Sequence, residues 1–265
     1  MVKISRQLKY YDLIRELAIT GFKLKYKGSF FGYLWSLMKP LFLFIILYLV
    51  FNNIFKLGKA IPNYPVYLLI GITLWGFFVD TTSMCMASIL SNGDLIRKIY
   101  FPRIVLPIAM SLTSFITLVF NLVVVFGFMV YTHVPFTLSI LKLPLYLVEF
   151  YIFTLGVSFF LASLYVRFRD IGPIWEVVAQ ALFYATPIIY SITLVTNEGL
   201  VRLMMMNPLA QIIQGSRNSL LGGAVVTSSQ VLESLRYIPF VMVVFVFIVG
   251  YLVFQKMAAK FAEEV

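Results

Sequence analysis

Residues 167–198 read RFRDIGPIWEVVAQALFYATPIIYSITLVTNE. Charged residues stand at the start, and the long apolar run behind them can cross the ~30 Å hydrocarbon core of a bilayer. Three polar side chains within the run, Glu176, Gln180 and Tyr184, recur every fourth position and therefore share one face of a helix. Polar groups in hydrocarbon cost roughly 2.5 kcal/mol or more each, so they normally face protein or water. The stretch predicts a membrane-spanning helix whose polar and aromatic face is kept away from lipid.

The composition excludes an ordinary soluble domain. Hydrophobic residues make up 61% of the chain and charged residues 12%, whereas soluble domains have roughly 45–50% and 25%. The single cysteine, Cys85, lies in an apolar run and allows no intramolecular disulfide. A membrane protein is therefore expected.

Apolar runs separated by turn residues predict six spans, at about residues 34–55, 66–90, 104–131, 143–166, 174–195 and 238–254. We expect one all-α polytopic domain over residues 1–265, in which residues 33–256 form the six-span bundle. Six spans place both termini on one side. Most of the 21 basic residues lie in segments on that side, at 3–27, 97–103, 167–169 and 256–260. Because basic loops stay in the cytoplasm, we expect both termini there. The net charge of +10 then reflects topology and contact with anionic lipid, and no nucleic-acid partner is expected.

Residues 1–32 predict a cytoplasmic interface helix. Apolar positions recur at helical spacing along one face, and charged residues occupy the other face; the apolar positions are Tyr10, Ile14, Leu17, Gly21 and Leu24. Such an amphipathic helix lies in the inner membrane interface. It could be a lipid anchor or a docking surface for a cytoplasmic partner.

Residues 196–236 form a second unusual region, predicted to be an outer gate. Asn207-Pro208 predicts a helix start and Gly222-Gly223 its end. The helix between them is too short to span, which indicates a re-entrant or interfacial segment. It could rest on the outer headgroups. Alternatively, it could be a lid over an exit path that carries Asn207, Gln211, Gln214, Arg217 and Asn218.

Aromatic side chains form a face on two predicted spans. The positions are Phe44, Tyr48, Phe51 and Phe55 on the first span, and Phe183, Tyr184 and Tyr190 on the fifth, where Pro187 interrupts the helix. An aromatic ring stacks on the C–H face of a pyranose and leaves the hydroxyl groups to water. With Glu176 and Gln180, these residues are the predicted channel lining. The alternative is that they face lipid or a neighbouring helix.

Other function classes find little support in the sequence. No G-x-x-x-x-G-K-[ST] run is present, His133 is the only histidine, and no cluster has metal-ligand spacing. We therefore expect no enzyme, no metal and no cofactor in this chain. Asp80, Glu149 and Glu176 are acidic residues within spans. They could relay ions in a secondary transporter, serve a membrane enzyme acting on lipid-linked sugar, or simply bond neighbouring helices.

Four fragments in order resemble the permease subunits of ABC exporters for cell-surface polysaccharides. They are KLKYKGSFFGYLWSLMKPL (23–41), NGDLIRKIYFPRIVLP (92–107), YVRFRDIGPIWEVVAQALFYATPIIYS (165–191) and NPLAQIIQGSRNSLL (207–221). Permeases for rhamnose-containing wall polysaccharides are the most similar, and those for O-antigen and teichoic acid are similar more distantly.

This resemblance implies a homodimer in the bacterial cytoplasmic membrane. It would recruit two copies of an ABC ATPase that carries the ATP and magnesium, and it would move a glycan linked to undecaprenyl phosphate or pyrophosphate outwards. The first and fifth spans would line the channel. The interface helix and the loop after the second span would meet the ATPase. The expected coupling residues are Asp94, which can cap a short helix, Arg97, Lys98 and Arg103, together with Arg167, Arg169 and Asp170 before the fifth span. Asp170 is also expected to cap the fifth helix.

Overall fold

The protein is described here by a computed structural model that covers residues 2–25, 27, 32–59, 61–259 and 261. Residues 28–31, at the end of the predicted interface segment, lie outside the described residues. Helices account for the regular structure, and no strand occurs in the described part of the chain. The predicted all-α class is confirmed.

Proline begins several of the long helices. Pro lies in the first turn of α3 (Tyr64–Ser91), α6 (Leu143–Arg167), α9 (Pro208–Leu220) and α11 (Ile238–Ala258). In the first turn the missing N–H has no helical partner to lose, and the fixed φ of proline favours the helix. These prolines therefore set where the helices start.

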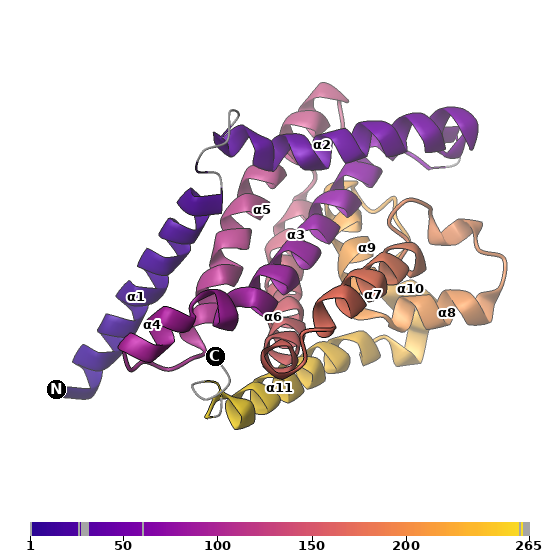
Figure 1. The fold of residues 1–265 in the computed structure, drawn as a ribbon. Helices are drawn as coiled ribbons and strands as arrows, with labels where there is room; N and C mark the ends of the chain where they lie inside the picture. The colour runs from indigo at the N-terminus through magenta and orange to yellow at the C-terminus, as the bar shows by residue number, and fades with distance from the viewer. Residues whose placement is uncertain (1, 26, 28–31, 60, 260, 262–265) are drawn as a thin grey trace.

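Helix α3 is the centre of the bundle, and most of its side chains are buried. It packs between α5 (Val105–Tyr131) and α6, and α11 packs against α6 (Figure 1). The backbones of α6 and α11 approach closely, because a Cβ on Gly250 would overlap the carbonyl of Gly156. Small residues of this kind let membrane helices pack tightly.

The predicted interface helix forms as α1 (Val2–Lys25) and packs along α5. Ala18 is buried, and its carbonyl accepts a hydrogen bond of 3.0 Å from Thr113 Oγ1. The predicted apolar face ends early, because Leu24 is exposed. The charged face, with Asp12 and Glu16, is also exposed.

The start of α1 and the end of α11 lie at the end of the bundle that carries the short helix α4 (Gly93–Lys98) (Figure 1). Ile96 of α4 belongs to one apolar cluster with Phe254 and Phe261, and Ile14 and Leu17 of α1 pack against it. The N-terminal helix, α4 and the C-terminus therefore form one packed unit.

Five helical stretches in the described part of the chain are long and apolar enough to cross a membrane. They are Trp35–Ile54, Tyr64–Ser91, Val105–Tyr131, Leu138–Arg167 and Ile238–Ala258. The first combines α2 (Trp35–Tyr48) with a π-helix, Leu49–Ile54. The chain is therefore a multi-pass membrane protein.

The predicted fifth span is shorter than expected. Helix α7 (Ile171–Ala185) has 15 residues, which gives a length of about 22 Å. It ends because Pro187 disfavours helical backbone at the residue before it, and Thr186 is extended. The predicted fifth span, at about 174–195, is therefore helical only to Ala185, and the helix ends at the interruption expected at Pro187.

Candidate functional site

The chain beyond α7 forms a buried, non-helical segment, residues 186–191, which we call the α7 break. Thr186 to Ile189 are all buried. Backbone outside helices is tolerated at membrane depth only where it is enclosed by protein and its polar groups are bonded. The side chains that hydrogen-bond the carbonyls of this segment are therefore the first part of the candidate site.

Three side chains bind four consecutive carbonyls of the α7 break. Arg217 donates from Nη1 to Pro187 O and from Nη2 to Ile188 O, both at 2.6 Å. The Tyr64 hydroxyl donates to Ile189 O at 3.1 Å, and the Tyr67 hydroxyl donates to Tyr190 O at 3.0 Å. We call Arg217, Tyr64 and Tyr67 the carbonyl clamp. It joins α3, α9 and the α7 break.

Arg217 is fully buried on α9, which is too short to cross a membrane. Its Nε donates to Tyr67 O at 2.9 Å, and Nη1 also donates to Gln214 Oε1 at 3.1 Å. Burial lowers the pKa of Arg217 to about 10, which leaves the group charged at neutral pH. Carbonyl oxygens and the face of the Tyr67 ring stabilise that charge.

Helix α7 shows the predicted polar face. Glu176, Gln180 and Tyr184 are exposed in the single chain. Trp175 lies on the opposite, buried side, where its Nε1 donates to Thr82 Oγ1 of α3 at 3.1 Å. The bundle thus holds one side of α7 and leaves the polar side uncovered.

Two more of the predicted lining residues hold the end of α7. Phe183 packs against Trp75 with ring centres 5.6 Å apart. The Tyr190 hydroxyl donates to the carbonyl of Tyr184 at 3.0 Å. Phe183 and Tyr190 therefore have structural contacts within the chain, and their role in lining a channel stays a prediction.

The predicted aromatic face of the first span divides in two. Phe44 is buried against Phe128 of α5, so it offers no surface to a passing polymer in this structure. Tyr48 stacks between Phe44 and Tyr64. Phe51 stacks on Phe55, which is exposed. Only the second half of the predicted face is open.

The predicted outer helix forms as α9 between the expected boundaries. Asn207 caps it by accepting a bond of 3.0 Å from Leu209 N, and Gly222 and Gly223 follow with positive φ. Its side chains are nearly all buried, since α9 packs on α3 and α6. This packing places α9 within the bundle; whether it rests at the headgroups or covers an exit path stays a prediction.

The remaining residues predicted for the outer gate also make internal contacts. Gln211 Nε2 donates to Glu149 Oε2 at 3.4 Å, and Gln214 Oε1 accepts from the Tyr67 hydroxyl at 3.4 Å. Asn218 is only partly buried. Their gating role stays a prediction.

The predicted coupling loop contains α4 and an exposed tip. Asp94, Arg97 and Lys98 are exposed on α4. Asn92 occupies the N-cap position, so the prediction that Asp94 caps the helix was wrong; Asp94 lies in the first turn. Arg103 packs with its guanidinium 5.5 Å from the Phe101 ring.

The charged group before α7 is exposed as well. Asp170 occupies the N-cap position, but its side chain makes no capping hydrogen bond, so that part of the prediction was wrong. Arg167 and Arg169 lie over the rings of Phe168 and Tyr165. All three charges remain at the surface.

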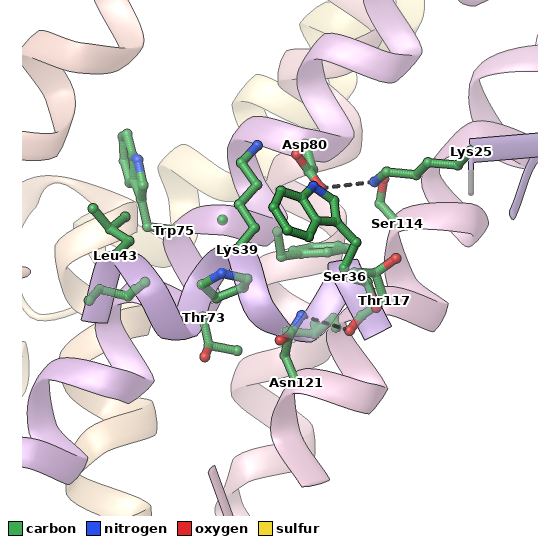
Figure 2. A pocket seen from close by; sticks show the side chains of 16 residues that line it. Lys25, Ser36, Lys39, Leu43, Thr73, Trp75, Asp80, Ser114, Thr117 and Asn121 are labelled. Carbon is green, nitrogen blue, oxygen red and sulfur yellow. Dashed lines mark hydrogen bonds and ion pairs between the residues drawn. The ribbon is translucent and has the colours of Figure 1, made fainter. Parts of the chain in front are cut away.

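A cavity of about 420 Å³ lies between α2, α3 and α5 (Figure 2). Its lining includes Lys39 and an ion pair of 3.0 Å between Lys25 Nζ and Asp80 Oδ2. Hydroxyl and amide groups line the same space, from Ser36, Thr73, Ser114, Thr117 and Asn121. A site that combines basic and neutral polar groups in this way suits an anionic headgroup or sugar hydroxyls.

The sequence carries signals for both the carbonyl clamp and the cavity beside Lys39. Tyr64 and Tyr67, three residues apart, share a helix face at the start of a span. Lys39 within an apolar run is costly unless it serves a polar site. Asp80, expected deep in the second span, is paired with Lys25 of α1.

Comparison with known proteins gives a consistent picture. The family model described as ABC-2 type transporter matches residues 12–221. The O-antigen export system permease protein RfbA of Klebsiella pneumoniae is 29% identical over 264 residues, covering 99% of this chain and 98% of the relative. The protein of the same name from Myxococcus xanthus is 29% identical over 217 residues, covering 80% of this chain and 82% of the relative.

Proposed function

The chain belongs to the ABC-2 type transporter family, and we propose that it is the transmembrane subunit of an ATP-driven exporter of cell-surface polysaccharide. The relatives named as O-antigen export permeases cover nearly the whole chain, which supports a glycan as the cargo. In this proposal a separate ATPase hydrolyses ATP with magnesium, and the chain itself is no enzyme.

The observation that carries the proposal is the uncovered polar face of α7. Glu176, Gln180 and Tyr184 stay exposed although the helix is apolar on its other sides. Lipid is a poor environment for this face. A second copy of the chain would enclose it, so that two such faces border one polar path. Exposed Phe55 and half-buried Phe51 of the first span would add rings on which sugars can stack.

The chain crosses the membrane six times in this proposal, with both termini in the cytoplasm of a bacterial cell. Helix α7 makes most of the fifth crossing, and the α7 break completes it. This fits because the clamp bonds the carbonyls that would otherwise be unpaired in the membrane. The basic segments and α4 then face the ATPase.

The cavity beside Lys39 is the proposed site for the phosphate or pyrophosphate that links glycan to undecaprenyl. Lys39 supplies the charge, while the Lys25–Asp80 pair is neutral as a unit. The hydroxyl groups around it can bond the first sugar. The same pairing of Asp80 gives no support to an ion relay.

Reconstitution of the purified chain tests the proposal. An ABC ATPase encoded beside it should copurify with an affinity-tagged chain. Proteoliposomes that contain both subunits and fluorescent lipid-linked glycan should expose the glycan to an external glycosidase only with ATP. Exposure without ATP, driven by a proton or sodium gradient, would instead establish a secondary transporter.

A further inference from the structure

We propose that Arg217 joins the α7 break and α9 to α3 as one rigid unit, so that the outer end of the path opens by movement of this whole unit. Helix α9 does not then swing away from α7 as a separate lid. The inference rests on the proposed export function. It assigns Arg217 as a positioning residue for the outer half of the path.

The bonds of Arg217 reach three segments that are far apart in the sequence. The residue itself is on α9, two of its bonds reach Pro187 and Ile188 of the α7 break, and a third reaches Tyr67 of α3. The side chain is fully buried. Separating α9 from the α7 break therefore breaks two charge-assisted bonds and leaves the carbonyls of Pro187 and Ile188 without their donor, which is costly for buried groups.

A second contact ties the other end of α9 to the same segment. Asn207 Nδ2 donates to Thr186 Oγ1 at 3.4 Å. Asn207 and Arg217 are ten residues apart, which is about 15 Å along the helix axis. One tie would let α9 pivot about a point, whereas two ties at this separation fix its direction relative to the break.

The tied unit includes the polar face of α7. The Tyr190 hydroxyl of the break donates to the carbonyl of Tyr184, which is the last residue of that face. Movement of α9 therefore carries the end of α7 with it. The width of the outer opening then follows the position of α7. If α9 were an independent lid, the opening could change while α7 stayed in place.

A reversible crosslink between positions 186 and 207 distinguishes the two modes of opening. The variant is Thr186→Cys with Asn207→Cys in a Cys85→Ser background. Because position 186 is buried, the pair is closed as a disulfide with iodine, a small oxidant, and opened again with a reducing agent. In the rigid unit the crosslink forms equally fast without nucleotide and with ATP. Export per assembled complex then stays within about twofold of that of the uncrosslinked protein, because changes at sites that do not interact usually add to within about that factor.

The proposal is overturned if the crosslink stops export and reduction restores it, because α9 must then leave the break. It is also overturned if no crosslink forms or if ATP changes its rate severalfold. The single-cysteine variants treated with the same reagent are the controls. A parent complex that exports no glycan contradicts the proposed function alone, since the crosslinking rates still test the rigid unit.

Arg217→Lys gives an independent test that distinguishes a positioning role of Arg217 from a role in stability alone. Lysine keeps the charge but cannot reach all the carbonyls that the planar guanidinium bonds. We expect a loss of export of about tenfold or more with ATPase binding retained. The 186–207 crosslink should then restore several-fold of that loss, because it strengthens the remaining tie between α9 and the α7 break. If the crosslink does not improve export by the lysine variant, the positioning role is contradicted. If the lysine variant fails to assemble, the crosslinking experiment in the protein that retains Arg217 decides whether the rigid unit exists.

Discussion

The guanidinium carbon of Arg217 lies 3.5 Å from the centre of the Tyr67 ring, and Nε of the same arginine donates to the backbone carbonyl of Tyr67 at 2.9 Å. One residue of α3 therefore receives Arg217 through both its ring and its backbone. The hydroxyl of Tyr67 donates a hydrogen bond to the carbonyl of Tyr190. A buried positive charge is stabilised in this way by dipoles and a ring face, and the α7 break is fixed against the centre of the bundle.

Gly71→Ala should disturb the carbonyl clamp by steric overlap with Arg217. A Cβ at Gly71 would overlap the Arg217 guanidinium and would lie 3.2 Å from Ile188 Cγ2. Overpacking of this kind costs typically 1–3 kcal/mol, so the thermal midpoint of the detergent-solubilised protein should fall. Gly76→Ala in the same helix is the matched control, since its Cβ meets nothing within 4 Å. Equal midpoints for the two variants would contradict the clamp geometry.

Tyr67→Phe should destabilise the protein by removing a hydroxyl while keeping the ring. The carbonyl of Tyr190 then loses its donor, which costs about 1–3 kcal/mol for a buried group. Tyr64→Phe should act likewise on the carbonyl of Ile189. Denaturant or thermal unfolding measures both. Tyr237→Phe is the control, because that exposed hydroxyl accepts a hydrogen bond from the neighbouring Arg236. An equally large fall in stability there would mean that the clamp has no special role.

Local sequence signals predicted the parts of the fold that depend on neighbouring residues. Helix α9 was predicted from Asn207-Pro208 and from Gly222-Gly223, and the structure uses those residues as cap and positive-φ stop. The limits of α3, α5 and α6 also follow apolar runs that end in turn residues. Such signals are short-range and can be read from one sequence.

The clamp could not be predicted in the same way. It needs Tyr67 and Arg217 to meet, and only the packing of α3 against α9 brings them together. The end of α7 was predicted in part. Apolar residues continue past Pro187, so the span was expected to reach about residue 195 with an interruption at Pro187. The helix ends there because of the backbone restriction before proline.

Inserting Gly-Ser after Ile99 should abolish export and leave the protein in the membrane. Ile96 of α4 is buried in the apolar cluster that includes Phe254, while Ile99 and Tyr100 are exposed. The insertion would separate the exposed tip from the start of α5 and prevent transmission of ATPase closure. The measurement is glycan exported per unit of ATP hydrolysed. The same insertion after Pro135, in the exposed turn beyond α5, is the control, and normal export from the Ile99 insertion would remove the loop from the mechanism.

Lys39→Ala should weaken the capture of lipid-linked substrate. The cavity beside α2 would lose the positive charge that is not balanced by Asp80. We expect the apparent KM for the anionic substrate to rise about tenfold with little change in the maximal rate, as for a contact made mainly in binding. Lys39→Arg should retain near-normal KM. Lys142→Ala is the control, because Lys142 is exposed at the N-terminal end of α6 and does not line the cavity. An equal effect there would show that general surface charge is responsible.

The polar face of α7 leads to the most direct test of the path. A polymer must bind and release at every repeat, so its contacts must be individually weak and repeated along the way. No single alanine at Tyr48, Phe183, Tyr184 or Tyr190 should therefore abolish export. Combined replacement on the fifth span should slow export severely, and Tyr184→Arg should block it.

Cysteine labelling decides whether that face borders water during transport. In a Cys85→Ser background, Gln180→Cys and Tyr184→Cys should react with water-soluble thiol reagents during ATP turnover, and lipid-linked glycan should slow the reaction. Ala179→Cys is the matched control, because that side of α7 is buried against the bundle. If positions 180 and 184 stay as unreactive as position 179 throughout turnover, the polar face packs against protein. The path must then lie elsewhere, since a side chain that never meets water cannot exchange bonds with a hydrated glycan.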